Sequence, residues 1–598
     1  MVKKDQSITR MPGADFDAVV IGAGFGGLYM THKLRDQLGM HVQSYDNALD
    51  VGGTWYWNRY PGALSDTESF VYCLSFDKDL LQEWNWKNRY ITQPEIMEYL
   101  NHFADRFDIR KSYQFDTKVT KAIFNETTNL WDVETDQGDT VTAQHLVTGL
   151  GLLSAANIPK FKDYDLFKGK TYHTGAWPRD GVDFKGKRVG VIGTGSTGQQ
   201  FITAVAPEAG HLTVFQRSPQ YSVPVRNRPL AEEELNQIKE TYDERWKQVF
   251  NSGVAFGFEE STTPCADLSE EETDKVFEAA WENGGGFRYM FETFSDIAID
   301  ERANEKAAAF VRKKIAEIVT DPVMASKLTP HDLYAKRPLC NAGYYETFNR
   351  NNVALADVKA DPIAEFTPTG IRTESGEEHE LDILVFATGF DAVDGSYTRM
   401  DIRGRNGVQI KDKWSDGPTS YLGIANAGFP NMHMILGPNG PFTNLPPSIE
   451  TQVDWISNLI EHVRETDQAV VEANQDAEDS WGAACSEIAN MTLFSKAESW
   501  IFGANIPGKA HAVMFYLGGL GNYRNVLAEE VSEGYKNFTF KKKQAEVANE
   551  PNGLFSKIAK FFVFQTRNGK PYLSRACGPG NVTTSSPLYN IRKCFTEP

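Results

Sequence analysis

Hydrophobic and polar positions near the start of the chain follow one another in an order that predicts a strand, a glycine-rich turn, a helix and a second strand. Residues 18–21 (AVVI) are apolar and mostly β-branched, which favours a buried strand. Residues 22–27 (GAGFGG) form the turn, and apolar side chains then recur through residues 28–38 with helical spacing. A second apolar run ends at Asp46, so the segment has the order of a βαβ unit.

The same order returns later in the chain. Residues 188–192 predict a strand, residues 193–198 (GTGSTG) a glycine turn, and residues 212–215 a second strand that leads into Gln216 and Arg217. A GxGxxG motif alone is a weak signal, but one followed by a helix and a strand is typical of dinucleotide-binding units. Two such units predict two nucleotide-binding domains.

Other segments depart from this pattern. Acid-rich amphipathic helices are expected at residues 232–249, 270–281 and 303–318, and we interpret residues 229–329 as a helical insertion. Residues 381–390 predict an apolar strand and a glycine turn, which suit a return to the first domain. After residue 540, the spacing of five apolar residues predicts one short amphipathic helix: Leu554, Phe555, Ile558, Phe561 and Phe562. We expect it to pack on the protein's own surface, with membrane contact as the less favoured alternative.

Composition narrows the class of protein. A chain of 598 residues is long enough for two or three domains, and 41% hydrophobic and 12% aromatic residues are values of an ordinary globular enzyme. The net charge of −19 argues against a nucleic-acid partner. The six cysteines form no CxxC pair and have no metal-site spacing, so no metal is expected. We find no secretory signal or membrane-spanning run and expect a cytoplasmic protein with no membrane contact.

The residue at the end of the second strand distinguishes the two predicted ligands, because it faces the adenosine ribose. Asp46 in the first unit can accept hydrogen bonds from ribose hydroxyls and would repel a 2′-phosphate, which fits FAD or NAD. Arg217 in the second unit, followed by Ser218, can hold a phosphate through two charged hydrogen bonds and favours NADP. The phosphates are expected at the N-terminal ends of the two helices, on Gly22, Gly24, Phe25, Gly27, Gly193, Thr194, Gly195, Ser196, Thr197, Gly198 and Gln199.

These observations predict an α/β fold with two Rossmann-like dinucleotide-binding domains, one for FAD and one for NADP(H), and a helical insertion in the NADP domain. The FAD domain is expected at residues 1–150 and 390–540, and the NADP domain at residues 151–228 and 330–389. Residues 541–598 are interpreted as a C-terminal extension. No cysteine pair lies near either unit, which argues against a disulfide reductase and leaves O2 as the electron acceptor.

Two further segments carry a family resemblance. Residues 167–178 fit the pattern FxGxxxHxxxWP, and residues 53–66 fit GxWxxxxYPGxxxD. Both resemble the signatures of type I Baeyer–Villiger monooxygenases. The resemblance covers about residues 15–540 and is closest to cyclohexanone monooxygenases, through residues 436–450 and 499–509. N- or S-oxygenating flavin monooxygenases have a similar first pattern, usually without the Trp-Pro pair, and remain the alternative. A catalytically silent dinucleotide-binding or redox-sensing protein is the second alternative.

The resemblance implies an enzyme that uses NADPH, FAD and O2 to convert cyclic or other hydrophobic ketones to esters or lactones through a flavin peroxide. It implies that Arg337 is the catalytic arginine and that Asp66 orients it near the flavin. Lys336 would join Arg217 in holding the 2′-phosphate, and Trp500 would contact the nicotinamide side of NADP. The flavin would be lined by Thr54, Trp55, Trp57, Tyr72 and Val119, and the substrate pocket by Phe442, Thr443 and Leu445.

Taken alone, several of these residues have plainer interpretations. A Lys-Arg pair is usually a solvated surface feature, and tryptophans such as Trp55 are often core residues. His173 lies inside a signature, but its position at the start of the second domain favours a structural or interdomain role, shared with Trp177. Besides ketone and O2 we expect no partner, and the protein is expected to be a monomer or a weak oligomer.

Overall fold

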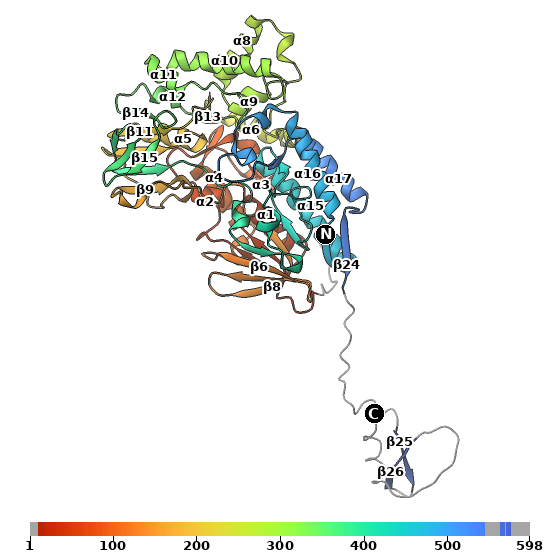
Figure 1. Cartoon of the computed structure of the whole chain (residues 1–598). Coiled ribbons are helices and arrows are strands. Elements are labelled where there is room, and N and C mark those ends of the chain that lie inside the picture. Colours follow the sequence, from red (N-terminus) through yellow and green to blue (C-terminus); the bar gives the residue numbers. More distant parts are fainter. Residues whose placement is uncertain (1–9, 544–561, 568–569, 576–598) are drawn as a thin grey trace. The chain divides into compact units, whose positions relative to one another are not determined.

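The computed structural model describes residues 10–543, 562–567 and 570–575 (Figure 1). The chain divides into two compact units, residues 1–542 and 543–598. The larger unit holds both predicted dinucleotide folds, and the smaller one holds a two-stranded antiparallel hairpin of β25 (Phe562–Arg567) and β26 (Lys570–Arg575). Among the described residues, no helix is long and apolar enough to cross a membrane.

The first sheet has eight strands and forms around β1 (Phe16–Ile21), whose residues after Phe16 are all buried. β1 pairs in parallel with β2 (Val42–Tyr45) and with β8 (Thr140–Thr148). β8 continues into an antiparallel meander with two further strands. The remaining members are β5 (Tyr113–Gln114), β6 (Val119–Asn125), β7 (Leu130–Thr135), β19 (Asp401–Arg403) and β20 (Met432–Met434).

The second sheet has five strands, all parallel, in the order β14-β11-β10-β18-β9. Its members are β9 (Lys170–His173), β10 (Arg188–Ile192), β11 (His211–Gln216), β14 (Val353–Asp357) and β18 (Ile383–Phe386). β18 falls inside the predicted apolar run at 381–390. It lies between β10 and β9, so this strand completes the second sheet and the chain returns to the first sheet only after it. The predicted α/β fold class is confirmed.

Each βαβ unit carries its helix at the predicted place. α1 (Phe25–His32) is buried along its whole length and continues as a short π-helical turn, Lys33–Gln37. α5 (Ser196–Val205) follows the second glycine turn. The long helix α15 (Leu445–Glu465) packs against α1. Further helices complete this part of the fold: α2 (Thr54–Trp57), α3 (Lys78–Glu83), α4 (Gln93–Arg106), α16 (Gln475–Asn490) and α17 (Leu520–Ser532).

Helices occupy most of residues 229–329. They are α6 (Glu232–Glu240), α7 (Tyr242–Asn251), α8 (Glu270–Asn283), α9 (Gly286–Phe291), α10 (Glu301–Ile318) and α11 (Pro322–Leu328). Of these, α8, α10 and α11 lie at the top of the larger unit in Figure 1. The single helix predicted at 232–249 is two helices, because Thr241 leaves the helical conformation. α8 begins with a capping box between Ser269 and Glu272, which is visible in the sequence as the pattern Ser-x-x-Glu.

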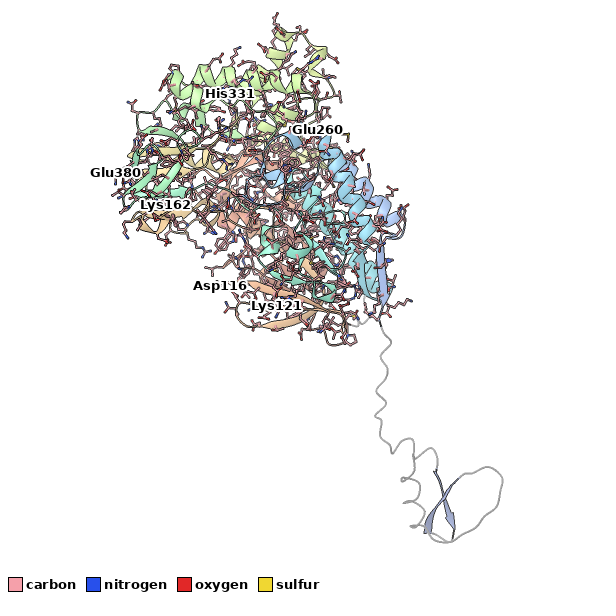
Figure 2. The ribbon with its side chains drawn as sticks, in the orientation of Figure 1. Asp116, Lys121, Lys162, Glu260, His331 and Glu380 are labelled. Carbon is pink, nitrogen blue, oxygen red and sulfur yellow. The ribbon has the colours of Figure 1, made fainter. Side chains whose placement is uncertain are left out.

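Charged side chains cover the outside of both dinucleotide folds. Figure 2 labels Lys162 and Glu380 near the second sheet and Asp116 and Lys121 near the first. The amphipathic helix predicted at 554–562 lies outside the described residues, except for Phe562, which begins strand β25.

Short pairs of strands also lie outside the two large sheets. β3 (Leu64–Glu68) pairs with β4 (Tyr90–Thr92), and β21 (Gly440–Pro441) pairs with β23 (Phe515–Tyr516). β22 (Gln468–Ala473) and β24 (Phe538–Lys542) form an antiparallel pair near the end of the larger unit.

Candidate active site

The first glycine turn has no room for side chains. Gly22 has a φ of +110°, and a Cβ there would lie 2.2 Å from the carbonyl oxygen of Gly149. A Cβ on Gly27 would lie 1.7 Å from the oxygen of Gly22. Only glycine lets the helix start this close to the strand, and the turn therefore exposes backbone N–H groups at the N-terminus of α1.

Asp46 lies beside this turn, at the end of β2, and is buried. Its two carboxylate oxygens accept hydrogen bonds from the backbone N–H groups of Ala23, at 2.5 Å, and Ala48, at 2.7 Å. Burial raises the pKa of Asp46, while these two hydrogen bonds act in the opposite direction. The predicted acid is therefore fixed at the place where a ribose would bind.

The second glycine turn repeats the first. Gly193 has a φ of +112°, and a Cβ on Gly198 would lie 2.2 Å from the oxygen of Gly193. A Cβ on Gly195 would meet no atom within 4 Å, so the space beside this residue is open to a ligand. Thr194 donates a hydrogen bond to the carbonyl oxygen of Ser218, which ties the turn to the end of β11. These glycines fit a dinucleotide in both turns.

The predicted phosphate-binding cations differ in their surroundings. Arg217 is exposed at the end of β11 and has no ion-pair partner among the described residues. Lys336 is bound to Asp332 through a 2.6 Å ion pair. Arg217 is thus free to meet a phosphate directly, whereas Lys336 would first have to leave its carboxylate.

The signature loop at 53–66 joins the two folds. Tyr60 donates a hydrogen bond to the side chain of Gln200 on α5, at 2.8 Å. Gly62 has a φ of +84°, and a Cβ there would lie 2.5 Å from the oxygen of Gln200. The Tyr-Pro-Gly motif is therefore a contact between the first fold and the helix of the second. In the same loop, the Trp55 indole donates to the hydroxyl of Tyr72 at 3.1 Å.

The loop ends at Asp66 on β3, and this residue meets Arg337. The Nη1 atom of Arg337 lies 2.5 Å from Oδ2 of Asp66, although the two residues are far apart in the chain. The Asp66 side chain is only 3% exposed, and its Oδ1 is a buried atom with no hydrogen-bond partner in the described part of the chain. The structure thus brings together the predicted pair of Arg337 and Asp66, and Oδ1 of Asp66 can still accept a hydrogen bond.

Arg337 keeps most of its donors free. Nη1 also donates to the carbonyl oxygen of Pro338, at 3.3 Å, but within the described residues Nε and Nη2 have no hydrogen-bond partner. The guanidinium carbon lies 5.1 Å from the ring centre of Phe287. A cation held at one nitrogen and packed on an aromatic face presents its other N–H groups to a ligand.

Aromatic side chains surround the predicted substrate loop. The Phe442 ring lies 6.4 Å from that of Trp500 and 5.3 Å from that of Phe515. Thr443 shares a 2.5 Å hydrogen bond with Ser448, and Leu445 begins α15. Trp500, Phe442 and the predicted pocket residues therefore form one region of the structure.

The other predicted flavin contacts are spread over the first fold. Thr54, Trp55 and Trp57 lie together on α2, and Val119 is buried at the start of β6. Trp57 also accepts, through its carbonyl oxygen, a hydrogen bond from the backbone N–H of Trp177. The flavin-facing roles of these residues stay predictions.

His173 ends β9 of the second sheet, and Trp177 contacts the first fold through its backbone bond to Trp57. His173 accepts a hydrogen bond from the N–H of Gly175 at 2.9 Å, and burial lowers its pKa. Trp177 is buried against Phe184 and Phe201. The hydrogen bond to the N–H of Gly175 is compatible with a structural role for His173, which stays a prediction.

Sequence reasoning missed Phe287 and Glu68. Phe287 follows a run of three glycines, Gly284–Gly286, which could have indicated a close backbone approach. Glu68 lies two residues after Asp66 and shares its face of β3. It is buried and pairs with Arg89 and Arg288, partners that no sequence pattern identifies.

A mixed eight-stranded sheet and a parallel five-stranded sheet each carry a glycine turn, and a loop between them brings a carboxylate to an arginine. This arrangement defines a flavoprotein of the two-dinucleotide class. A family model described as flavin-binding monooxygenase-like matches residues 17–224. The described part of the chain holds no group of three or more His, Cys, Asp or Glu side chains suited to a metal ion.

Known proteins resemble nearly the whole larger unit. A Baeyer–Villiger monooxygenase of Pseudooceanicola batsensis is 64% identical over 88% of this chain and 96% of its own. The NADP+-bound structure of cyclohexanone monooxygenase from Rhodococcus sp. Phi1 is 59% identical, with a TM-score of 0.87, over 88% of this chain and 99% of its own. A phenazine N-monooxygenase of Lysobacter antibioticus is 52% identical over 88% of this chain and 96% of its own. The chain belongs to the Baeyer–Villiger monooxygenase family, and the predicted family and enzyme class are confirmed.

Proposed function

We propose that this protein uses NADPH and O2, with bound FAD, to insert one oxygen atom beside the carbonyl carbon of hydrophobic ketones. The observation that carries the proposal is the Arg337–Asp66 pair, which places a guanidinium with free donors beside the signature loop. We place its action in the reduced cytoplasm, as a monomer or weak oligomer. The four free cysteines of the described chain support a reducing compartment.

The two glycine turns divide the cofactors. FAD would bind in the first domain, residues 1–150 and 390–540, with its phosphates on the turn at Gly22 and its ribose at Asp46. NADP would bind in the second domain, residues 151–228 and 330–389, with Arg217 on the 2′-phosphate. When bound, NADPH would supply the hydride that reduces FAD, and reduced FAD would activate O2, of which one atom goes to the ketone and the other leaves as water.

Arg337 would act on charge that develops at the substrate. Negative charge grows on the former carbonyl oxygen when the ketone is attacked, and a guanidinium stabilises it without losing a proton. Asp66 holds one nitrogen of Arg337 and limits the motion of the fork, so its free N–H groups stay aimed in one direction. The unpaired Oδ1 of Asp66 can accept a hydrogen bond from a bound cofactor.

The aromatic side chains of the predicted substrate region favour apolar ketones. Phe442, Trp500 and Phe515 pack against one another and offer aromatic faces, and Phe287 covers one side of Arg337. A ring or alkyl chain gains by leaving water for such walls, while the carbonyl oxygen meets the single cation. Cyclic ketones satisfy both requirements.

N-oxygenation is the second candidate, because a relative that is 52% identical is a phenazine N-monooxygenase. An aromatic amine or N-heterocycle is itself the nucleophile and produces no oxyanion on the substrate for Arg337 to stabilise. The two reactions therefore differ in how strongly they depend on Arg337.

The test measures NADPH consumption by the FAD-loaded protein with cyclohexanone, with phenazine and without substrate, and identifies products by mass. We expect lactone in step with NADPH for the ketone. An N-oxide from phenazine with no lactone from any ketone would support the second candidate. If NADPH were oxidised with hydrogen peroxide as the only product, with cyclohexanone and with phenazine alike, both candidate functions would be contradicted.

A further inference from the structure

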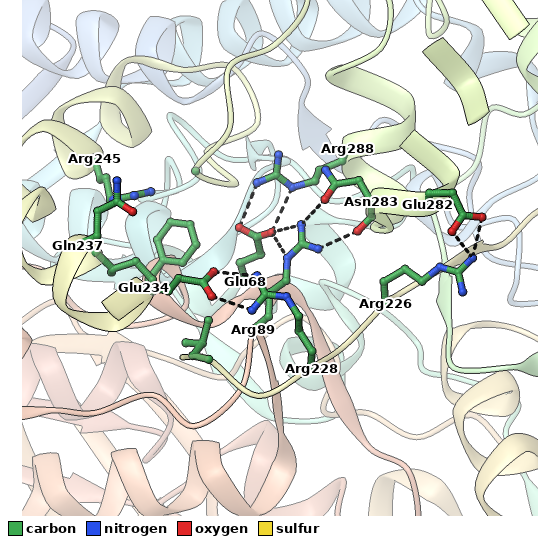
Figure 3. A pocket seen from close by; sticks show the side chains of 14 residues that line it. Glu68, Arg89, Arg226, Arg228, Glu234, Gln237, Arg245, Glu282, Asn283 and Arg288 are labelled. Atoms are coloured by element: carbon green, nitrogen blue, oxygen red, sulfur yellow. Dashed lines mark hydrogen bonds and ion pairs between the residues drawn. The ribbon is translucent and has the colours of Figure 1, made fainter. Parts of the chain in front are cut away.

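A cavity of about 430 Å³ lies outside the Arg337 site and is lined by five arginines. We call it the arginine cavity and define it by Arg89, Arg226, Arg228, Arg245 and Arg288, with Glu68, Glu234 and Glu282 also in its wall. Figure 3 shows these side chains from close by, with ion pairs between the arginines and glutamates of the wall. They come from β3, α6, α7, α8, α9, the segment before β4 and the segment after β12 (Val223–Pro224). Its volume is in the range of small-molecule sites.

The inner end of the arginine cavity is neutralised and rigid. Glu68, 6% exposed, binds Arg89 at 2.7 Å and Arg288 at 3.1 Å, and Arg288 also binds Glu292. Arg89 donates to both the backbone and the side-chain oxygen of Asn283. These guanidinium groups have their donors occupied, so they form a fixed floor.

The outer rim keeps free charge. Arg245 donates its Nε to Thr241 and lies over the ring of Phe70, but it has no carboxylate partner among the residues that the structure describes. Arg226 is 44% exposed and uses only Nη2 to bind Glu282. Five guanidinium groups face three glutamates of the wall and Glu292, which leaves one positive charge in a chain whose net charge is −19. Local positive charge in such a protein attracts small anions.

The floor of the arginine cavity adjoins the catalytic pair. A second cavity, of about 10 Å³, shares Glu68 and Arg288 with it and is also lined by Asp66 and Phe287. Asp66 and Glu68 share one face of β3. Glu68 lines both cavities, and Asp66, which binds Arg337, lines the second one. Phe256 and Phe287 stack with ring centres 3.9 Å apart, and both line this second cavity, which has about the volume of one water molecule.

We propose that the arginine cavity is a vestibule that binds carboxylates and so favours ketones that carry a carboxylate group on their way to Arg337. The rim guanidinium groups of Arg226 and Arg245 attract and hold the anion, and the apolar part of the ketone reaches Arg337 when the stacked rings of Phe256 and Phe287 move apart. This inference rests on the proposed ketone oxygenation for its catalytic consequence, while the binding of a carboxylate in the cavity stands independently of it.

The catalytic test compares 4-oxocyclohexanecarboxylate with its methyl ester, which differs by one charge. We expect the acid-to-ester ratio of kcat/KM to fall about tenfold in the Arg226→Gln/Arg245→Gln double variant, since two exposed charged contacts are lost. The ratio in the unaltered enzyme should also fall at high salt. Arg302→Gln is the control, because it removes one arginine charge, half of the change in the double variant, from exposed α10 outside the cavity. An unchanged ratio in the double variant, or an equal fall in the control, would overturn the proposal.

A binding test separates this inference from the reaction. Hexanoate and inorganic phosphate are titrated calorimetrically into the FAD-loaded enzyme at equal ionic strength. We expect hexanoate to bind more tightly than phosphate, and its affinity to fall about tenfold in the double variant and not in Arg302→Gln. Tighter phosphate binding, or hexanoate affinity unaffected by the double substitution, would overturn the vestibule. Failure of both ketones to react, with hexanoate binding as expected, would reject the proposed function alone.

Discussion

At the scale of single residues, one ion pair organises the site. Arg337 is 27% exposed and is held through one nitrogen by Asp66, which is nearly inaccessible. A buried carboxylate loses its hydration, and the charge of its partner offsets this cost. Removal of either side chain would therefore destabilise the one that remains. The arrangement positions a permanent cation and leaves several of its donors to the ligand.

Substitution of the pair should affect turnover far more than cofactor binding. Arg337→Ala should lower kcat/KM for cyclohexanone by about 100- to 1000-fold, the usual cost of losing one donor to a developing oxyanion. Arg337→Lys should recover part of this loss, because it keeps the charge without the planar fork. Steady-state kinetics with the visible FAD spectrum as a control would check this. Retention of more than a tenth of the activity in Arg337→Ala would contradict the role.

Asp66→Ala tests the positioning role separately. Arg337 would keep its charge but lose its anchor, and a displacement of about 1 Å costs on the order of 100-fold in rate. We expect kcat to fall while the KM for NADPH changes little. A normal kcat in Asp66→Ala would show that Arg337 needs no partner.

At the scale of elements, α15 carries a buried acid that links it to the segment after β3. Glu450 accepts hydrogen bonds from the backbone N–H and the hydroxyl of Ser75, both at 2.6 Å. Burial raises its pKa to about 7, with Asp454 acting in the same direction and the Ser75 bonds and Arg524 acting against it. The acid is therefore protonated in the folded state at a pH where it ionises in the unfolded chain.

The pH dependence of stability follows with a definite sign. The folded pKa lies above the unfolded value of 4.5, so the folded state binds more protons between these values and stability falls as pH rises from about 4.5 to 7. The difference corresponds to on the order of 3 kcal/mol. Glu450→Gln should remove this part of the dependence and raise the melting temperature at pH 8 relative to the unaltered protein. If Glu450→Gln and the unaltered protein had the same melting temperature at pH 8, and also at pH 5.5, the predicted role of Glu450 would be contradicted.

The elements also show how far sequence patterns reach. Glycine turns, their helices and the acid or arginine at the strand ends are local signals, so both βαβ units were predictable. The partners of Glu68 were not, because Arg89 and Arg288 come from a different turn and helix. The break at Thr241 was also hidden, since α6 and α7 continue one amphipathic pattern. Contacts between distant segments depend on the packing of the whole chain, which local spacing does not encode.

At the scale of the whole molecule, specific hydrogen bonds join the two folds. Tyr60 donates to the side chain of Gln200, and the backbone N–H of Trp177 donates to the carbonyl oxygen of Trp57. Movement between a pose for flavin reduction and one for oxygenation would strain these contacts first.

Trp177 offers the test at this scale. Trp177→Ala empties space between Phe184 and Phe201 and should loosen the joint between the folds, so that water reaches the site. We expect the share of NADPH converted to hydrogen peroxide to rise at least severalfold, while Trp177→Phe stays close to the unaltered enzyme. If a folded Trp177→Ala variant released no more hydrogen peroxide per NADPH than the unaltered enzyme, Trp177 would have no role in holding the two folds together.

The central claim is that this chain transfers one atom of O2 to a ketone. The most direct measurement is the mass of the product formed from cyclohexanone under labelled oxygen, ¹⁸O₂, with NADPH counted in parallel. The account predicts a lactone that carries one ¹⁸O atom for each NADPH consumed, and loss of this product in Arg337→Ala. A lactone without label, or NADPH consumed with no oxygenated ketone, would contradict it.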